Sequence, residues 1–437
     1  MNSNTPQFKE SFDRLQAKEP HTGLVAIREK AFQELGRLGI PTVRHEEWKY
    51  TRIGSLFSNN NYILPVDETV SLNAADLDKF KLPGHDDANV VVFINGKLSE
   101  VNTRIISNQL VLLPLELATD GEYAEIVRTH FGHSSKYHQD GINALNTAFV
   151  QGAVFIHVKK NAVVQHPVYV YNITDAKQDH VLSQPRSLVH LGENSQAVFV
   201  ETYGSLGSES TFTNQVCEII VEKEAKLEYY KIQNEAQQNN TVSTTHIRQV
   251  GKSYTHSVTI SLDGGIVRNN LNIILEAEYS EAHLHGLYLQ KGNSHVDNHT
   301  LVDNVKPNCY SNELYKGIID GNATAVFNGK IFVRQDAQKT NAYQSNKNIL
   351  LSDSASVNTK PQLEIFADDV KCSHGCTIGQ LNEEGVFYLQ SRGISEKNAK
   401  ALLLHAFAED IMEHIKLQPI RVYVDQLISE RLEFNVI

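Results

Sequence analysis

Cysteine, methionine and tryptophan are scarce in this chain of 437 residues, which contains four, two and one of them. Four cysteines in so long a chain do not make a disulfide framework, and free thiols are typical of a reducing compartment. The N-terminal stretch MNSNTPQFKESFDRLQ has no apolar signal-peptide core, and no segment approaches the roughly 18 uninterrupted apolar residues of a membrane-spanning helix. We therefore expect a soluble, cytoplasmic protein that does not enter a membrane.

Motifs of nucleotide hydrolysis and of common hydrolases are also missing. The sequence has no GxxxxGKS or GxxxxGKT phosphate-binding loop, no GxGxxG that opens a helix, no GxSxG elbow and no HExxH. The formal net charge of −11 argues against broad binding to nucleic acids or to anionic membranes. If nucleotide hydrolysis drives the task of this protein, a partner must supply it.

Helical periodicity is confined to the two ends of the chain. Apolar residues recur at steps of three or four between residues 24 and 38, near the N-terminus. The same pattern recurs between residues 399 and 415, after Ser395, which is a suitable N-cap. We therefore expect an N-terminal helical region over residues 1–60 and a C-terminal helical region over residues 384–437.

Between these ends the sequence is rich in short runs that resemble strands. We expect a mixed α/β segment over residues 61–145 and a β core over residues 146–383. In the core, a small residue follows a polar pair just before each of six such runs, at Ala197, Ala225, Thr255, Ala282, Ala323 and Ala355. The intervals between these positions are 28, 30, 27, 41 and 32 residues.

A repeat of this length predicts one structural coil per repeat. A single coil cannot bury its apolar face, so the core forms only when neighbouring coils stack. Because the repeated elements are strands, the pattern favours a mainly β fold with a parallel β-helix core. The alternative is a β-sandwich whose turns happen to be similar.

Two of the four cysteines flank a histidine in the stretch VKCSHGCTIG. On a strand, Cys372, His374 and Cys376 would point to the same face, with neighbours about 6–7 Å apart. Cys372 and Cys376 would be about 13 Å apart, so all three could share one ion only if Gly375 bent the chain. A closed zinc site needs four ligands, and this stretch offers three. The alternative is an inert strand whose cysteines are buried as small apolar residues.

A second candidate metal site lies in a histidine-rich run between residues 281 and 303. The run contains four histidines and two of the aspartates that could join them as ligands: His283, His285, His295, His299, Asp297 and Asp303. Residues two apart on a strand share a face, so metal binding is conceivable, whereas solvated or hydrogen-bonded histidines are the commoner case.

Parallel β-helices also carry carbohydrate-active enzymes, which need paired carboxylates in a cleft. The adjacent pairs Asp368-Asp369 and Glu383-Glu384 would face opposite ways on a strand. A carbohydrate-active enzyme therefore stays an alternative, as does an inert structural solenoid that serves only for interaction.

The segment from residue 325 to 381, AVFNGKIFVRQDAQKTNAYQSNKNILLSDSASVNTKPQLEIFADDVKCSHGCTIGQL, resembles the SufB/SufD family of iron–sulfur cluster assembly proteins. The following FYLQSRGIS and the earlier HEEWKYT, at residues 45–51, are similar to the same family. ADDVKCSHG favours the SufD branch. The resemblance implies a right-handed parallel β-helix between helical ends.

The resemblance also implies a non-catalytic scaffold subunit that pairs with SufB and binds the ATPase SufC. Cys372 and His374 match the CSH motif of the family, which implies an interfacial half-site for a transient iron–sulfur cluster or iron shared with SufB. Cys376 departs from the family, and its role stays open. No tightly bound cofactor is expected, and self-pairing is an option without SufB.

The SufC-binding region is expected in the C-terminal helices. We expect its contact residues on the apolar stripe through Leu402, Leu403 and Phe407, which could instead pack on the β-helix of the same chain.

Overall fold

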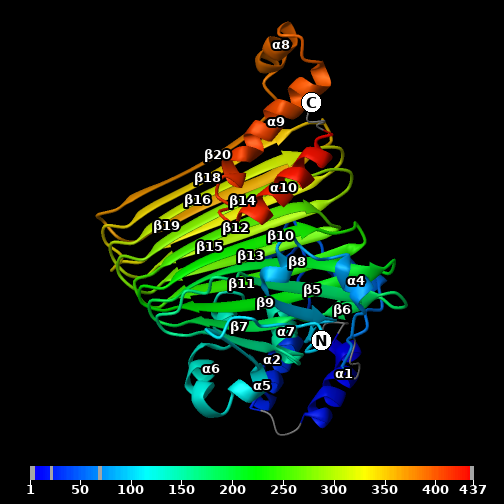
Figure 1. Ribbon diagram of the computed structural model, residues 1–437, viewed down its shortest axis with the longest axis vertical. Coiled ribbons are helices and arrows are strands. Elements are labelled where there is room, and N and C mark those ends of the chain that lie inside the picture. Colours follow the sequence, from blue (N-terminus) through cyan, green and yellow to red (C-terminus); the bar gives the residue numbers. More distant parts are fainter. Residues whose placement is uncertain (1–4, 20–22, 67–70, 434–437) are drawn as a thin grey trace.

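The computed structural model describes residues 5–19, 23–66 and 71–433. Within them, two sheets of ten strands form a solenoid of about eight turns, with helices near both ends of the chain (Figure 1). From β8 onward successive strands alternate between the two sheets, and each pairs in parallel with strands two positions away in the chain. The predicted mainly β fold with a parallel β-helix core is confirmed.

We call the two sheets sheet 1 and sheet 2. Sheet 1 contains, in spatial order, β2 (Lys97–Leu98), β1 (Asn89–Ile94), β5 (Val168–Ala176), β8 (Gln196–Gly207), β10 (Lys226–Asn234), β12 (Tyr254–Asp263), β14 (Glu281–Gln290), β16 (Tyr310–Ile319), β18 (Asn341–Leu350) and β20 (Lys371–Gly379). Sheet 2 contains β19 (Ser356–Ile365), β17 (Thr324–Val333), β15 (His295–Asn304), β13 (Ile266–Leu275), β11 (Asn239–Gln249), β9 (Thr211–Val221), β7 (Arg186–Leu191), β4 (Val154–Val158) and β3 (Leu110–Pro114), with β6 (Val181–Ser183) paired to β9.

The coil length agrees with the repeat seen in the sequence, but the repeat mixes the two sheets. Paired strand starts in sheet 1, from Lys226 through Tyr254 and onward to Lys371, lie 27 to 31 residues apart. Ala323 and Ala355 precede strands of sheet 2, whereas the four earlier markers belong to sheet 1. The long interval of 41 residues before Ala323 is therefore the step from one sheet to the other.

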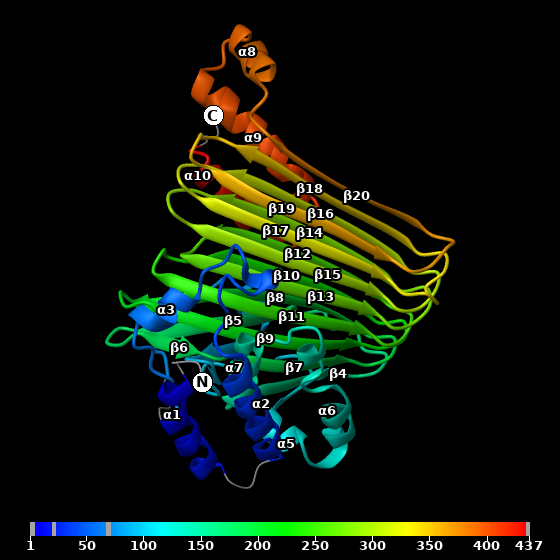
Figure 2. The same ribbon diagram turned by 180° about the vertical axis from the view of Figure 1, so that it is seen from behind.

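Helices of the N-terminal region gather around the first coils of the solenoid (Figure 2), where most of them pack on sheet 2. They are α1 (Thr5–Lys18), α2 (Val25–Leu38), α3 (Gly54–Asn59), α4 (Ala74–Asp78), α5 (Leu115–Ala118), α6 (Ala124–His130) and α7 (Gly141–Ala148). β1 pairs with β5 and β3 pairs with β4, so the predicted mixed segment 61–145 adds strands to both sheets. The boundaries at residues 60, 145 and 383 stay predictions.

The C-terminal region consists of α8 (Glu383–Ser391), α9 (Glu396–Met412) and α10 (Gln418–Arg431). Ser395 caps α9, because its hydroxyl accepts a hydrogen bond from the Asn398 N–H. Apolar side chains of α9 and α10 pack on the outer face of sheet 1, whereas α8 projects beyond the last coil (Figure 1). No helix of the described residues is long and apolar enough to span a membrane.

Candidate functional site

All of the stretch VKCSHGCTIG except its first residue forms β20, the last strand of sheet 1. β20 pairs with β18 on one side, and no strand of the described residues pairs with its other edge. Apart from the half-buried Cys372, every residue of β20 is exposed. The Cys/His stretch therefore lies at an open end of the solenoid, where another strand can approach.

Pairing with β18 shows which way the three donors face. Cys372, His374 and Cys376 lie in register beside three buried residues of β18, namely Ala342, Gln344 and Asn346. Paired residues on neighbouring strands share a face of the sheet. The donors therefore stand on the face that is turned to the solenoid interior one coil earlier, and at this last coil that face is open.

The three donors do not converge on one ion within the chain. The register of β20 runs without a shift from Lys371 to Gly379, so Gly375 does not bend the strand. Cys372 and Cys376 stay about 13 Å apart along it. Among the residues that the structure describes, Cys372, His374 and Cys376 belong to no cluster of metal-ligating side chains whose ligand atoms lie close together. Each of the three side chains can therefore bind a metal ion or cluster only together with ligands from outside this chain's strand edge.

The thiols differ in environment. Cys372 packs against the apolar interior of the solenoid, and burial raises the pKa of its thiol. Cys376 is exposed, and so is the His374 imidazole. Cys217 and Cys309 are buried, and burial raises the pKa of Cys217 to about 12. Cys376 and His374 are thus the accessible donors of the edge, with Cys372 one side chain further in.

A polar column inside the solenoid ends at His374. Glu313, Gln344 and His374 lie in register on β16, β18 and β20. Gln344 Nε2 donates a hydrogen bond of 2.7 Å to Glu313 Oε2, and Oε1 of Gln344 has no hydrogen-bond partner in the described part of the chain. Burial raises the pKa of Glu313 to about 7. The register therefore places His374 next to a buried amide that has one unused acceptor.

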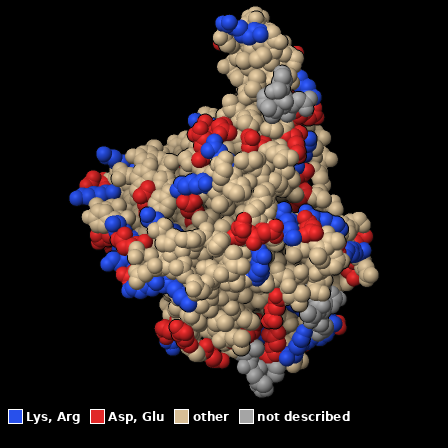
Figure 3. Space-filling view, viewed as in Figure 1, with Lys and Arg blue, Asp and Glu red and all other residues tan. Residues whose placement is uncertain are grey.

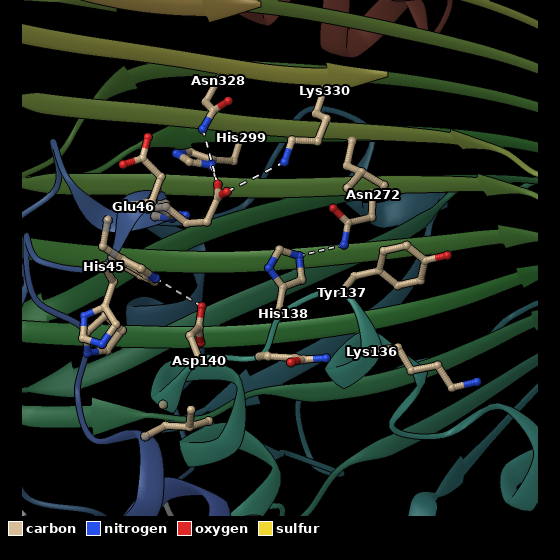
Figure 4. A pocket seen from close by; sticks show the side chains of 18 of the residues that line it. His45, Glu46, Lys136, Tyr137, His138, Asp140, Asn272, His299, Asn328 and Lys330 are labelled. Atoms are coloured by element: carbon tan, nitrogen blue, oxygen red, sulfur yellow. Dashed lines mark hydrogen bonds and ion pairs between the residues drawn. The ribbon is translucent and has the colours of Figure 1, made fainter. Parts of the chain in front are cut away.

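A separate cavity of about 520 Å³ lies where the N-terminal region meets sheet 2 (Figure 4). Its wall comes from the HEEWKYT segment, from residues 136–141 and from β13, β15 and β17. In the close-up, His138, Tyr137 and Lys136 rise from one side, while Lys330, His299 and Asn328 descend from the strands above. No pattern in the sequence predicted this cavity, because its lining residues are separated by up to about 290 positions.

The HEEWKYT segment is held on sheet 2 by a buried arginine of β13. The Arg268 guanidinium stacks on the Trp48 ring at 3.9 Å, donates to the carbonyl of Glu47 at 2.6 Å and pairs with Asp297 at 2.9 Å. A hydrogen bond to His299 lowers the pKa of Glu47 to about 2. These charged groups join the segment to sheet 2, so its tryptophan and glutamate act as anchors of the N-terminal region.

The histidine-rich run does not form the single metal site that its spacing allowed. His283 and His285 lie on β14 in sheet 1, whereas His295 and His299 lie on β15 in sheet 2. His283 Nε2 is 2.6 Å from a Glu281 carboxylate oxygen, and His295 bonds with the hydroxyls of Thr51 and Thr324. Asp297 pairs with Arg268, and Asp303 pairs with Arg334. His285 instead lies beside His256 and His414.

The predicted ATPase-binding stripe is only partly free. Leu402, Leu403 and Phe407 are half-buried, and Phe407 packs in the apolar cluster between the C-terminal helices and sheet 1. The Lys316 ammonium lies 4.3 Å from the Phe407 ring centre and donates to the Phe407 carbonyl. Much of Phe407 therefore contributes to packing within the chain.

Comparison with known sequences assigns the family. The family described as "SUF system FeS cluster assembly, SufBD core domain" matches residues 171–407, and "SufBD protein N-terminal region" matches residues 4–170. The chain belongs to the SufBD family of iron–sulfur cluster assembly proteins. Together the two matches span the whole solenoid, its N-terminal helices and the C-terminal region as far as residue 407.

SufBD relatives cover most of the chain. An iron–sulfur cluster assembly SufBD family protein of Synechocystis is 32% identical over 419 residues, which span 93% of this chain and 91% of the relative. The iron–sulfur cluster assembly protein SufD of Escherichia coli is 30% identical over 407 residues, which span 92% and 91%. The chloroplastic protein ABCI7 of Arabidopsis thaliana is 32% identical over 273 residues, or 61% and 58%.

Proposed function

We propose that the chain is a SufD-like scaffold subunit whose open solenoid end pairs with a SufB chain and supplies part of a cluster-assembly site. The observation that carries this proposal is the position of Cys372 and His374 on the unpaired edge of β20. The family and the similarity to a protein named SufD supply the cluster chemistry.

The open end has the properties of a pairing surface. β19 and β20 are the last strands of the two sheets, and each is paired on one side only in the described chain. Such edges present free N–H and C=O groups to another strand. Ile365, Phe366 and Ile378 add exposed apolar side chains there. A related β-helix chain fits this end, and a second copy of this chain is the alternative partner when SufB is absent.

The donors suit iron and sulfide as cargo. Thiolate and imidazole bind iron in many proteins, and His374 and Cys372 lie too far along one strand to enclose a cluster alone. A partner strand opposite β20 would bring the remaining ligands. Gln344 Oε1, which lies beside His374 in register, would accept the free N–H of its ring and fix the nitrogen that faces the cargo.

ATP hydrolysis would come from a SufC-like partner on the C-terminal region. Phe387 and Tyr388 of α8 are 72% and 58% exposed, so the projecting helix offers more free apolar surface than the predicted stripe. Uncharged residues cover much of this projection in Figure 3, with basic groups at its tip. We therefore place the ATPase contact on α8 and on the Leu402 and Leu403 side of α9.

Replacement of His374 by alanine tests the half-site. The complex is reconstituted with SufB and SufC, and cluster formation from iron and sulfide is followed anaerobically by absorbance. We expect His374→Ala to slow formation at least about tenfold, because one ligand of the site is lost. Ser373→Ala, on the opposite face of the same strand, is the matched control and should keep the normal rate.

Capture of SufB and SufC by both variants shows that each still folds and assembles. A normal rate of cluster formation with His374→Ala in the assembled complex would contradict the half-site. Loss of SufB capture with intact folding would instead assign His374 to pairing alone.

A further inference from the structure

Three histidines that lie far apart in the sequence meet on the outer face of sheet 1. His256 is on β12, His285 is on β14, and His414 lies between α9 and α10. One metal-ligating nitrogen of each lies within 4.8 Å of the other two. His256 and His285 are each only 2% exposed, whereas His414 is half-buried and closes the group from the solvent side.

The spacing of the two buried rings fits ligation of one ion. His256 Nε2 and His285 Nδ1 are 3.2 Å apart. Two nitrogens that bind one tetrahedral zinc ion at about 2.0–2.1 Å lie about 3.3 Å from each other. The His414 ring is parallel to the His285 ring, with centres 3.5 Å apart. Because His414 lies in the link after α9 and is partly exposed, its ring can turn to bring a third nitrogen to the ion.

The protein alone leaves this pair incompletely bonded. His256 Nδ1 and His285 Nε2 have no hydrogen-bond partner in the described residues. A neutral pair that shares one hydrogen bond then leaves one buried lone pair and one buried N–H unused, whichever ring donates. A buried polar group without a partner costs about 1–3 kcal/mol. An ion that takes the lone pairs of both facing nitrogens replaces the one shared hydrogen bond with two metal bonds, while His256 Nδ1 and His285 Nε2 each keep an N–H.

The surroundings favour the metal-binding form of the rings. Both rings are almost fully withdrawn from water, which disfavours the charged imidazolium, and neutral imidazole is the form that binds a metal. The Lys416 ammonium, two residues after His414, is bonded to a Glu228 carboxylate at 3.0 Å, which offsets its charge. His283 is bonded to Glu281 and stays outside the group.

We propose that His256, His285 and His414 bind one Zn²⁺ ion that fastens the link between α9 and α10 to sheet 1. Three imidazoles without a thiolate suit zinc, with water as the fourth ligand. The ion holds the C-terminal helices on the solenoid and takes no part in cluster assembly. The proposal is independent of the half-site at His374, which lies on the edge strand β20.

Zinc binding is measured in the full chain with Cys372→Ser and Cys376→Ser, which removes the accessible thiols as competing ligands. Isothermal titration gives the stoichiometry and affinity for Zn²⁺, and the visible spectrum of the Co²⁺ form reports tetrahedral geometry. We expect one ion per chain, a tetrahedral Co²⁺ spectrum and a zinc-dependent rise in the melting temperature.

His414→Ala removes a half-exposed ligand and should leave the fold intact, as circular dichroism can verify. We expect it to weaken zinc binding at least about tenfold and to abolish the rise in melting temperature. His283→Ala is the matched control, because this neighbouring histidine points to Glu281, and it should bind zinc normally. Absent zinc binding in the thiol-free chain, or equal affinity in His414→Ala, overturns the proposal.

Discussion

The buried carboxyl of Glu313 should make the solenoid less stable as pH rises. Glu313 is almost fully buried on β16 and accepts a hydrogen bond from Gln344 Nε2 at 2.7 Å. Burial raises the pKa of its carboxyl from 4.5 to about 7, while the hydrogen bond from Gln344 opposes the rise. Glu313→Gln has the same shape and cannot ionise, so it imitates the protonated acid at every pH.

The size of the effect follows from the two pKa values. Between pH 4.5 and about 7 the unfolded chain loses this proton while the folded chain keeps it. Unfolding then releases a proton, so a rise in pH favours the unfolded state. A shift of about 2.5 pKa units at about 1.4 kcal/mol per unit lowers the free energy of unfolding by about 3.5 kcal/mol in total. Above about pH 7 both states are ionised, and the loss stays constant.

Urea unfolding of the wild type and of Glu313→Gln at about pH 5 and about pH 8 measures this contribution. We expect the variant to gain about 2.5 kcal/mol relative to the wild type between the two pH values, because part of the effect falls below pH 5. Glu235 has a similarly raised pKa of about 7 and is present in both chains, so its contribution cancels in the comparison. Equal pH dependence of the two chains would refute the reasoning.

Two further predictions concern packing and thiol access. A Cβ on Gly286 would overlap the buried Tyr315 ring, so Gly286→Ala should lower the free energy of unfolding by about 1–3 kcal/mol in urea. Gly375→Ala meets no atom within 4 Å and should change stability little; an equal loss in both variants would refute the steric account. In the native chain a thiol reagent should modify the exposed Cys376 rapidly and leave the buried Cys217 unmodified until urea is added. Rapid modification of Cys217 without urea would contradict its burial.

The sequence predicts the fold class well because the repeat of a solenoid is visible within short segments of its sequence. Each coil repeats two strands, one in each sheet, and the turns that join them within about 30 residues, so short windows of sequence carry the signal. The end strands are harder to predict, since β1 and β3 join the two sheets from a segment without the repeat. The switch between sheets at Ala323 was likewise hidden, because strands of both sheets have the same residue pattern.

The candidate site also has a part that the local sequence predicts and a part that it does not. The strand character of residues 371–379 follows from local sequence, and β20 confirms it. That β20 ends the solenoid depends on the absence of a further coil, which no window around Cys372 can reveal. The cavity beside Arg268 and the cluster around His285 both join residues more than a hundred positions apart, because segments from outside the coils pack on the stacked strands.

The number of stacked coils also sets the length of the solenoid along its axis. Each added coil lengthens the axis by one strand spacing of about 4.8 Å, whatever the length of its turns. Insertions of a few residues in a turn, such as those that vary the coil from 27 to 31 residues, leave the axial length unchanged. The axial distance between Trp48 and His374 therefore depends on the number of coils between them. Only the gain or loss of a whole coil of about 30 residues would alter it.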